Sequence, residues 1–335
     1  MNIAVDAFGS DNAPYPEIEG AVAAINSQYC DKIYLVGKQD IIAKELDKYF
    51  YPEKSIEIVN ADEIITPNED PVMAVRTKKD SSLNKSILLN KERKADAVVS
   101  AGSTGAVMAA SLFTYGRILG VKRPGLAISL PTQREPEIIL DVGANVDCTV
   151  ENLVQFAEMG TIYAKSYLKK SNPRIALLNI GEERRKGNEL TISTHRELEK
   201  LPDINFIGNI EGKDILKGIV DVIICDGFIG NIMLKIVEGV ALSLFDIFKE
   251  QLKKDWIAKI GALLAYPVFS HLRKTMDYTE YGGAFLLGVD GITIITHGRS
   301  NSKAIKNTIR FANFASKSHF LEHIKRYYKE RKNNE

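Results

Sequence analysis

Short apolar runs recur along the chain, and each predicts a strand of a buried sheet. Several runs are continuously apolar instead of alternating with polar residues, which is typical of strands that are covered on both faces. The predicted strands are Ile3–Asp6, Lys32–Val36, Ser55–Val59, Ala97–Ser100, Leu126–Leu130, Ile138–Val142, Arg174–Asn179, Asn205–Ile207, Val222–Cys225 and Thr293–Thr296. Helical patterns lie between many of these runs. The predicted helices are Tyr15–Ser27, Gln39–Tyr49, Thr104–Leu119, Glu151–Leu168, Asn231–Lys253 and Ser302–Lys325.

The alternation of strands and helices predicts an α/β fold with three layers, α/β/α, around a doubly wound and mainly parallel sheet. We expect residues 1–335 to form a single domain with an insertion, which is an ordinary size for this class. Pro16 stands in the first turn of its predicted helix, and Gly120 stands just past the end of another. Both residue types are common at these helix positions.

Residues 245–274 do not follow this alternation of strands and helices. They predict a helical-pair insertion in which the helix is interrupted near Tyr266 and Pro267. The segment lacks a strand pattern, and lysine and arginine outnumber acidic residues in it. Two interpretations are open: a helix packed on its own core or on a dimer partner, or an interfacial helix with its apolar face in lipid. The apolar residues at helical spacing are Trp256, Ile260, Leu263 and Leu264.

Composition excludes several classes of protein. A formal net charge of +1 argues against a dedicated nucleic-acid-binding protein. Cys30, Cys148 and Cys225 are far apart and include no CxxC pair, which fits a reducing compartment and argues against a cysteine-rich zinc site or a disulfide framework. The N-terminus lacks a signal-peptide pattern, and 18 apolar residues never run together. We therefore expect a cytoplasmic protein without a membrane-spanning helix.

Glycine, asparagine and aspartate cluster where several predicted strands end, which is where ligands of open α/β sheets bind. Backbone amides and small side chains in these loops, with the cations of residues 184–186, suit an anion. Each cluster alone also has the interpretation of a plain turn. The candidate substrate- and phosphate-binding residues are Asp6, Gly102, Ser103, Thr104, Gly105, Asp141, Gly143, Asn145, Gly181, Glu182, Asn188, Asp226 and Gly230.

Standard catalytic motifs are absent: the chain has no P-loop pattern, no GxGxxG and no GxSxG. Residues 319–323 match HxxEH, but no third ligand is in view, and we expect no metal. Cys148 and Cys225 are open to two interpretations, thiolate nucleophiles or small buried side chains. His297 follows a predicted strand and is interpreted either as a ligand contact or as a structural hydrogen-bonding residue.

In this order along the chain, the loops resemble one family, the phosphate acyltransferases of the PlsX type, which make acyl phosphate from acyl-acyl carrier protein. Phe8 and Ser10 stand where that family usually has Met and Gly, which leaves the preferred acyl-chain length open. The matching stretches extend over nearly the whole chain: Val5–Pro14, Ser100–Gly105, Asp141–Asp147, Gly181–Asn188, Asp226–Asn231, Tyr281–Gly288 and His297–Ser300.

The resemblance implies a fold like that of isocitrate and isopropylmalate dehydrogenases and phosphotransacetylases, a homodimer, and no metal or nucleotide cofactor. It implies transfer of a long-chain acyl group from acyl carrier protein to inorganic phosphate, with the product passed to a glycerol-phosphate acyltransferase in phospholipid synthesis. Peripheral association with the inner face of the cytoplasmic membrane is also implied, which favours the interfacial interpretation of the Trp256–Val268 segment.

On this interpretation, catalysis needs mainly positioning and oxyanion stabilisation, because phosphate is already an anionic nucleophile and a thioester is already activated. Lys186 would fix the phosphate, and Asn231 would donate to the developing oxyanion. His297, Asn188 and Asn145 would hold the geometry. Rival interpretations are a phosphotransacetylase-like enzyme that uses acyl-CoA, a dehydrogenase of the same fold, and a non-enzymatic anion-sensing or scaffold module.

Overall fold

A computed structural model describes residues 1–254, 261, 263–267 and 282–334. The strands are β1 (Asn2–Asp6), β2 (Lys32–Gly37), β3 (Ile56–Asn60), β4 (Ala97–Ser100), β5 (Gly125–Leu130), β6 (Glu137–Leu140), β7 (Ile175–Asn179), β8 (Phe206–Glu211), β9 (Val222–Ile224), β10 (Ala284–Leu287) and β11 (Thr293–Ile295). Within the described residues they form one sheet of 11 strands in the order β3-β2-β1-β4-β11-β10-β5-β6-β9-β7-β8.

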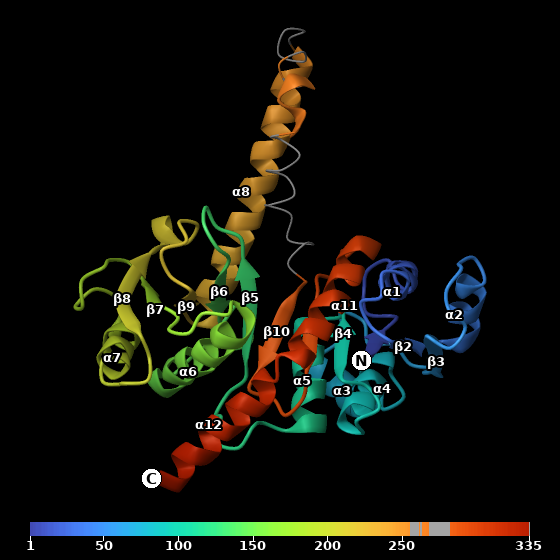
Figure 1. Ribbon diagram of the computed structural model, residues 1–335, viewed down its shortest axis with the longest axis horizontal. Coiled ribbons are helices and arrows are strands. Elements are labelled where there is room, and N and C mark those ends of the chain that lie inside the picture. Colours follow the sequence, from blue (N-terminus) through green and yellow to red (C-terminus); the bar gives the residue numbers. More distant parts are fainter. Residues whose placement is uncertain (255–260, 262, 268–281, 335) are drawn as a thin grey trace.

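The sheet consists of two parallel halves (Figure 1). In one half, β3, β2, β1, β4 and β11 pair in parallel. In the other half, β6, β9, β7 and β8 pair in parallel. Between the halves, β10 and β5 pair antiparallel with each other and with their outer neighbours. Three successive reversals leave the two halves running in opposite directions, and they meet at β10 and β5.

Helices cover both faces of this sheet. Their bounds are α1 (Tyr15–Asn26), α2 (Gln39–Leu46), α3 (Pro71–Thr77), α4 (Ser82–Lys91), α5 (Thr104–Tyr115), α6 (Val150–Tyr167), α7 (Glu189–Leu198), the 3₁₀ turn η1 (Gly212–Asp214), α8 (Gly227–Lys254), α11 (Ser302–Lys317) and α12 (Phe320–Asn334). One hydrophobic core lies between the sheet and α1, α6, α11 and α12. A second core lies on the opposite face, under α4, α5 and the base of α8. The predicted three-layer α/β/α class is confirmed.

Each predicted strand is present in the sheet, although β8 runs to Glu211, beyond its predicted end. The predicted helix Thr104–Leu119 is too long: α5 ends at Tyr115, because Gly116 follows it with a φ of +76°. Gly120 therefore does not end this helix. The predicted helix Ser302–Lys325 is two helices, α11 and α12, since the chain takes a left-handed φ of +53° at His319 between them.

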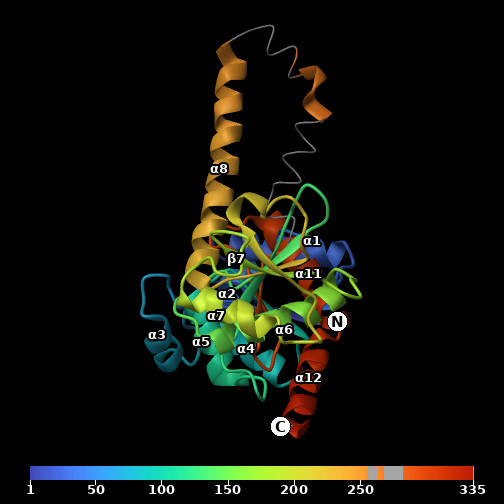
Figure 2. The same cartoon turned by 90° about the vertical axis from the view of Figure 1, so that its left-hand side faces the viewer.

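Helix α8 leaves the body of the protein as a projecting arm (Figures 1 and 2). It has 28 residues and continues through position 245, where the predicted insertion begins. Over Gly227–Leu252 it is long and apolar enough to cross a membrane by length and composition alone. The apolar side chains exposed along its outer side are Ile232, Ile236, Val240, Leu244 and Ile247.

The second part of the predicted helical pair is described only at positions 261 and 263–267, which are largely helical. Leu263 and Leu264 are 75% and 79% exposed. Trp256 and Ile260 lie outside the described residues, and so does the chain that follows Pro267 up to position 281.

Candidate active site

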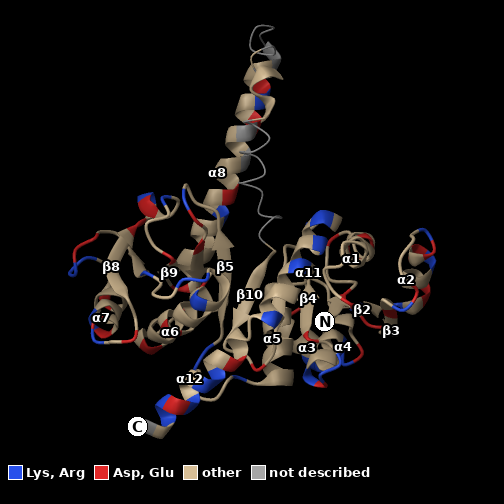
Figure 3. Ribbon diagram, in the orientation of Figure 1, with Lys and Arg blue, Asp and Glu red and all other residues tan. Residues whose placement is uncertain are grey.

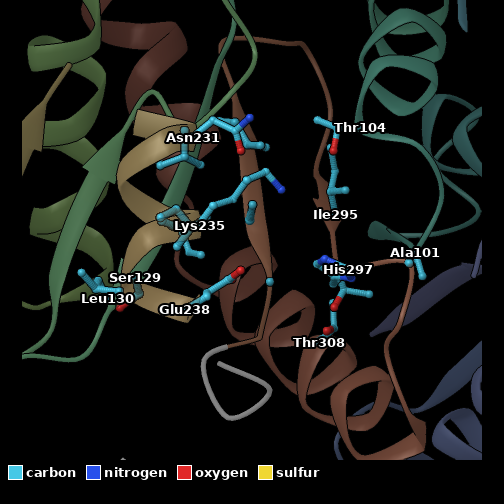
Figure 4. A pocket seen from close by; sticks show the side chains of 18 of the residues that line it. Ala101, Thr104, Ser129, Leu130, Asn231, Lys235, Glu238, Ile295, His297 and Thr308 are labelled. Atoms are coloured by element: carbon cyan, nitrogen blue, oxygen red, sulfur yellow. The ribbon is translucent and has the colours of Figure 1, made fainter. Parts of the chain in front are cut away.

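A cavity of about 380 Å³ opens where the two halves of the sheet meet. One wall consists of the loops after β1 and β4, the start of α5, and the loop after β11. The other wall consists of β5 and the first four turns of α8. Figure 4 shows side chains of α8 facing His297 and Thr308 across this space. Of the sequence-predicted residues, the cavity brings together Gly102, Ser103, Thr104, Asn231 and His297.

The N-terminus of α5 forms one end of the polar part of the cavity. Ser103 is the N-cap residue, and its side chain makes no capping hydrogen bond. The first amide groups of a helix have no partner inside the helix, and the helix dipole favours negative charge beside them. Because Gly102, Ser103 and Thr104 all line the cavity, the helix presents these donors to a ligand. The arrangement suits a phosphate group.

Asp6 supports the loop that carries Gly102 through hydrogen bonds. Its Oδ2 accepts a hydrogen bond from Ser100 Oγ at 2.7 Å, and the Ser100 oxygen accepts one from the Gly102 amide at 3.1 Å. A Cβ at Gly9 would stand 2.7 Å from the Gly102 nitrogen, so the two loops touch through their backbones. Asp6 is buried and does not line the cavity, and burial raises the pKa of its carboxyl group. Asp6 therefore has a structural role, because it supports this loop.

The first turn of α8 fixes the position of Asn231. Asp226 caps the helix, since its Oδ1 accepts the Ile229 amide at 2.9 Å. A Cβ at Gly230 would stand 1.9 Å from the carbonyl oxygen of Asp141, so the first turn of α8 packs directly on the backbone after β6. A Cβ at Gly143 would lie 3.7 Å from the Asn231 side chain. Asp226, Gly143 and Gly230 thus position Asn231 and do not themselves line the cavity.

The ring of His297 is oriented by its own loop. Its Nδ1 lies 3.1 Å from the Arg299 amide, which can only donate, so Nδ1 accepts. In a neutral imidazole the other nitrogen then carries the proton. A neutral His297 ring therefore carries its proton on Nε2, and Nδ1 is not available as a base.

Asp141 and Asn145 form a buried hydrogen-bond network beside the cavity. The Asp141 carboxylate accepts the backbone amides of Leu126, Gly143, Ala144 and Asn145 at 2.7–3.1 Å. The Asn145 side-chain nitrogen donates to Pro124 O and to Asp141 Oδ2. Both residues satisfy their polar groups within the protein and shape the loop after β6.

The loop between β7 and α7 stands apart from the cavity. Lys186, Gly181, Glu182 and Asn188 do not line it, and the Lys186 side chain is exposed. Asn188 caps α7, since its Oδ1 accepts the Thr191 amide at 2.9 Å. The phosphate-binding role of Lys186 stays a prediction, as does that of Gly105, which packs against Pro71 outside the cavity lining.

Sequence reasoning missed Lys235 and Glu238, two charged side chains of α8 that line the cavity. A usable signal was present in the sequence. Together with Asn231 they stand at positions i, i+4 and i+7, which is the spacing of one helix face.

An apolar region continues from the polar part of the cavity between β5 and α8. Its side chains would surround a hydrocarbon chain, because apolar ligand groups are favoured in apolar surroundings. The apolar lining residues of these elements are Leu126, Ile128, Leu130, Leu234, Val237 and Ala241, with Pro131, Val142 and Leu216 beside them.

The cysteines are not suited to nucleophilic attack. Burial raises the pKa of Cys148 to about 12, and it raises the pKa of the fully buried Cys225 thiol well above its usual range. A thiol with so high a pKa stays protonated at neutral pH, and the thiolate is the reactive form. In the described part of the chain, no group of three or more His, Cys, Asp and Glu side chains is placed to hold a metal ion.

Glu17 of α1 supports the loop after β1 from inside the protein, and it gives stability a pH dependence. Its Oε1 accepts the Ser10 amide at 3.0 Å, and its Oε2 has no partner among the described residues. Burial raises the pKa of Glu17 from 4.5 to about 7. A raised pKa means that the neutral form is favoured in the folded state, so stability present below pH 4.5 is lost as the pH rises towards 7.

We therefore expect Glu17→Gln to lose less stability than the wild type between pH 5 and pH 8. The expected difference in the free energy of unfolding is about 3 kcal/mol, from a shift of this size. Urea unfolding at both pH values measures it. Glu137, which also has a pKa raised to about 7, acts equally in both proteins and cancels in the comparison. Parallel pH profiles for the two proteins would contradict the prediction.

Comparison with known proteins supplies independent information. Residues 1–323 match the model of a family described as "Fatty acid synthesis protein". A phosphate acyltransferase of Dictyoglomus turgidum is 51% identical over 313 residues, 93% of this chain and 93% of that protein. A phosphate acyltransferase of Clostridium acetobutylicum is 49% identical over 330 residues, 98% of this chain and 99% of that protein.

Solved structures with the same fold include two acyl-transferring enzymes. A phosphotransacetylase from Streptococcus pyogenes superposes with a TM-score of 0.61 at 15% identity, covering 93% of both chains. A branched-chain phosphotransacylase from Enterococcus faecalis superposes with a TM-score of 0.59 at 12% identity, covering 95% of this chain and 99% of the other. At such low identity the likeness concerns the fold.

Proposed function

This chain belongs to the fatty acid synthesis protein family of phosphate acyltransferases, and from that premise we propose that it transfers a long-chain fatty acyl group from acyl-acyl carrier protein to inorganic phosphate. The product would be an acyl phosphate for phospholipid synthesis. The observation that supports the proposal most is the shared cavity: oxyanion donors from α5, α8 and His297 stand at the entrance to an apolar region.

The reaction needs donors more than a base. A phosphate oxygen attacks the thioester carbonyl carbon, the new C–O bond forms, and the C–S bond breaks with release of the thiolate. Negative charge develops on the carbonyl oxygen, where fixed N–H donors stabilise it. The Asn231 amide and His297 Nε2–H would supply these donors, while the N-terminus of α5 would hold phosphate. Each of these groups is fixed before substrate arrives, by the contacts described above.

The acyl donor is the point on which the leading proposal and its rival differ. The apolar region between β5 and α8 supports a long acyl chain over an acetyl group. The rival is a phosphotransacetylase-like enzyme that uses acyl-CoA, and its support is the shared fold. Release of free thiol, measured with palmitoyl-acyl carrier protein and with palmitoyl-CoA at equal concentration, distinguishes them. A higher kcat/KM for palmitoyl-CoA would overturn the proposed donor.

An acidic carrier protein would dock on basic side chains near residues 249–274 or on α12. Such steering weakens with salt, because mobile ions screen exposed charges. A kcat/KM for the carrier substrate that stays constant between about 20 and about 300 mM salt would count against electrostatic docking.

We also propose a homodimer, with the exposed apolar side of α8 covered by a second copy of the chain. Figure 3 shows most of this arm in the colour of uncharged residues, and the exposed residues Ile236, Val240 and Leu244 recur at helical spacing. Unpartnered apolar strips of this length usually mark interfaces. Sedimentation velocity measures the state directly, and a monomer at micromolar concentration would contradict the proposal.

Membrane association at the inner face of the cell membrane is the last part of the proposal, and it places Leu263 in lipid. Leu263 and Leu264 are largely exposed, and Tyr266 is 66% exposed beside them. Burying one leucine side chain contributes about 1.5–3 kcal/mol, so Leu263→Glu should lower binding to vesicles of anionic phospholipid about tenfold or more. Co-sedimentation measures this. Ile41→Glu, a change at an exposed position of α2, is the matched control. Equal binding of both variants would remove Leu263 from the membrane contact.

A further inference from the structure

A phosphate ion in the cavity needs a positive charge beside it, and the charge comes from helix α8 and not from a loop. Among the described residues that line the cavity, Lys235 is the one lysine or arginine. The acidic side chains of Asp11 and Glu238 line the same space and oppose the entry of an anion. Lys235 offsets one of these two negative charges: the formal charge of the lining is −1 with it and would be −2 without it, which would disfavour a phosphate ion more strongly.

Lys235 stands one helical turn after Asn231, so both side chains project from the same face of α8. Figure 4 shows the ammonium group of Lys235 extending into the cavity, from the α8 wall towards the wall that carries Ile295 and His297. The Asn231 side chain lies above it in this view, and the start of α5 at Thr104 lies across from both. The cation and the oxyanion donors therefore converge on one volume.

No described residue competes for the ammonium group of Lys235. Within the described residues Lys235 forms neither a salt bridge nor a hydrogen bond, even though Glu238 is three residues further along the same helix. A lysine that is held away from carboxylates keeps its three donors for a ligand. Its helix is fixed at the base by Gly227 and Gly230, whose Cβ positions are occupied by the backbone of residues 141–145.

The cations of the loop between β7 and α7 are not placed in this way. Lys186 is exposed and does not line the cavity. Arg184 is committed to Glu199, with its Nη2 2.8 Å from the carboxylate. The strand order explains the separation, because β6 and β9 stand between β5 and β7.

We propose that Lys235 is a further catalytic residue, which binds the phosphate nucleophile and holds it between the N-terminus of α5 and Asn231. The inference rests on the proposed function for the identity of the nucleophile. Glu238, one turn deeper, repels the phosphate from the apolar region and so confines it to the polar end. The acyl chain then occupies the space beyond Glu238, along Val237 and Ala241.

The test compares Lys235→Gln, Lys235→Arg and a charge-matched control, Lys44→Gln, at an exposed position of α2. Removing a hydrogen bond to a charged group costs enough to change a binding constant about 10- to 100-fold. We therefore expect the KM for phosphate to rise by that factor in Lys235→Gln, with the KM for the acyl donor unchanged. Lys235→Arg should recover part of the loss, and Lys44→Gln should match the wild type.

Phosphate binding without any acyl donor gives a second, independent readout. The ³¹P line width of inorganic phosphate broadens when the ion exchanges onto a protein, and we expect this broadening with wild type and with Lys44→Gln but not with Lys235→Gln. Circular dichroism and thermal unfolding establish that the variants are folded. A folded Lys235→Gln protein that broadens the phosphate signal as much as the wild type does would overturn the proposal. An equal rise of both KM values would also overturn it, because that result indicates a structural role.

The two proposals fail separately. If the wild type produces acyl phosphate and Lys235→Gln keeps the wild-type KM for phosphate, the role of Lys235 is wrong while the proposed function stands. If the wild type broadens the phosphate signal through Lys235 but forms no acyl phosphate, the anion site stands while the proposed function is wrong.

Discussion

Replacing Asn231 by alanine is expected to lower kcat by about 10²- to 10³-fold, the usual effect of losing one oxyanion donor. The side chain lines the cavity, and the backbone that carries it is fixed by Gly230 and by the Asp226 cap. Its contribution should appear only when charge develops on the thioester oxygen. The KM values for both substrates should therefore change much less than kcat.

Steady-state kinetics with the carrier substrate and phosphate measure this effect. Ile41→Ala is the matched control, because the residue stands in α2, is 42% exposed and does not line the cavity. It should keep near-normal turnover. A folded Asn231→Ala protein with near-wild-type kcat would remove Asn231 from the oxyanion site.

Replacing Asp141 by alanine should have the largest effect on stability, about 4 kcal/mol or more. The buried carboxylate accepts four backbone amides and the Asn145 side chain. Without it these buried donors lose their acceptor, and each unsatisfied group costs about 1–3 kcal/mol. The loop after β6 also carries Gly143, which packs against Asn231, so activity should fall with the loss of structure.

Urea unfolding with a constant m-value measures this change in the free energy of unfolding. Asp141→Asn, which keeps one acceptor oxygen, should be less destabilised than Asp141→Ala. The sequence suggested Asp141 as a phosphate-binding residue, and the two roles give different results. A fully stable Asp141→Ala protein with a selectively raised KM for phosphate would favour direct binding over the structural role.

Most strands were predictable because apolar runs such as Ile138–Leu140 and Val222–Ile224 have no polar residue to interrupt them. Strand β10 was not predicted, since its four residues stand between Gly282-Gly283 and Gly288, and glycines on both sides are typical of turns. Helices α3 and α4 were missed for a related reason: they are short, and their starts depend on the caps Asp70 and Ser81, which also look like turn residues.

The site was predictable in part. The loops after β4, β6, β9 and β11 were recognised from their glycine and asparagine residues, and these loops either line the cavity or support it. Lys186 looked equivalent because its loop has the same composition. What sequence does not contain is the spatial order of strands, which places β7 next to the edge strand β8 and away from β5. Lys235 was overlooked because it lies inside a helix and outside the loops.

Trapping of the product with hydroxylamine tests the central claim most directly. An acyl phosphate reacts with hydroxylamine to give an acyl hydroxamate, which mass spectrometry identifies by its acyl chain. Hydroxylamine also reacts directly with the thioester, and a sample without the protein measures that background. Above it, we expect hydroxamate from palmitoyl-acyl carrier protein only when phosphate is present, in an amount equal to the thiol that the protein releases. Thiol release without hydroxamate, or an intact carrier substrate after prolonged incubation with phosphate, would contradict acyl-phosphate formation by this protein.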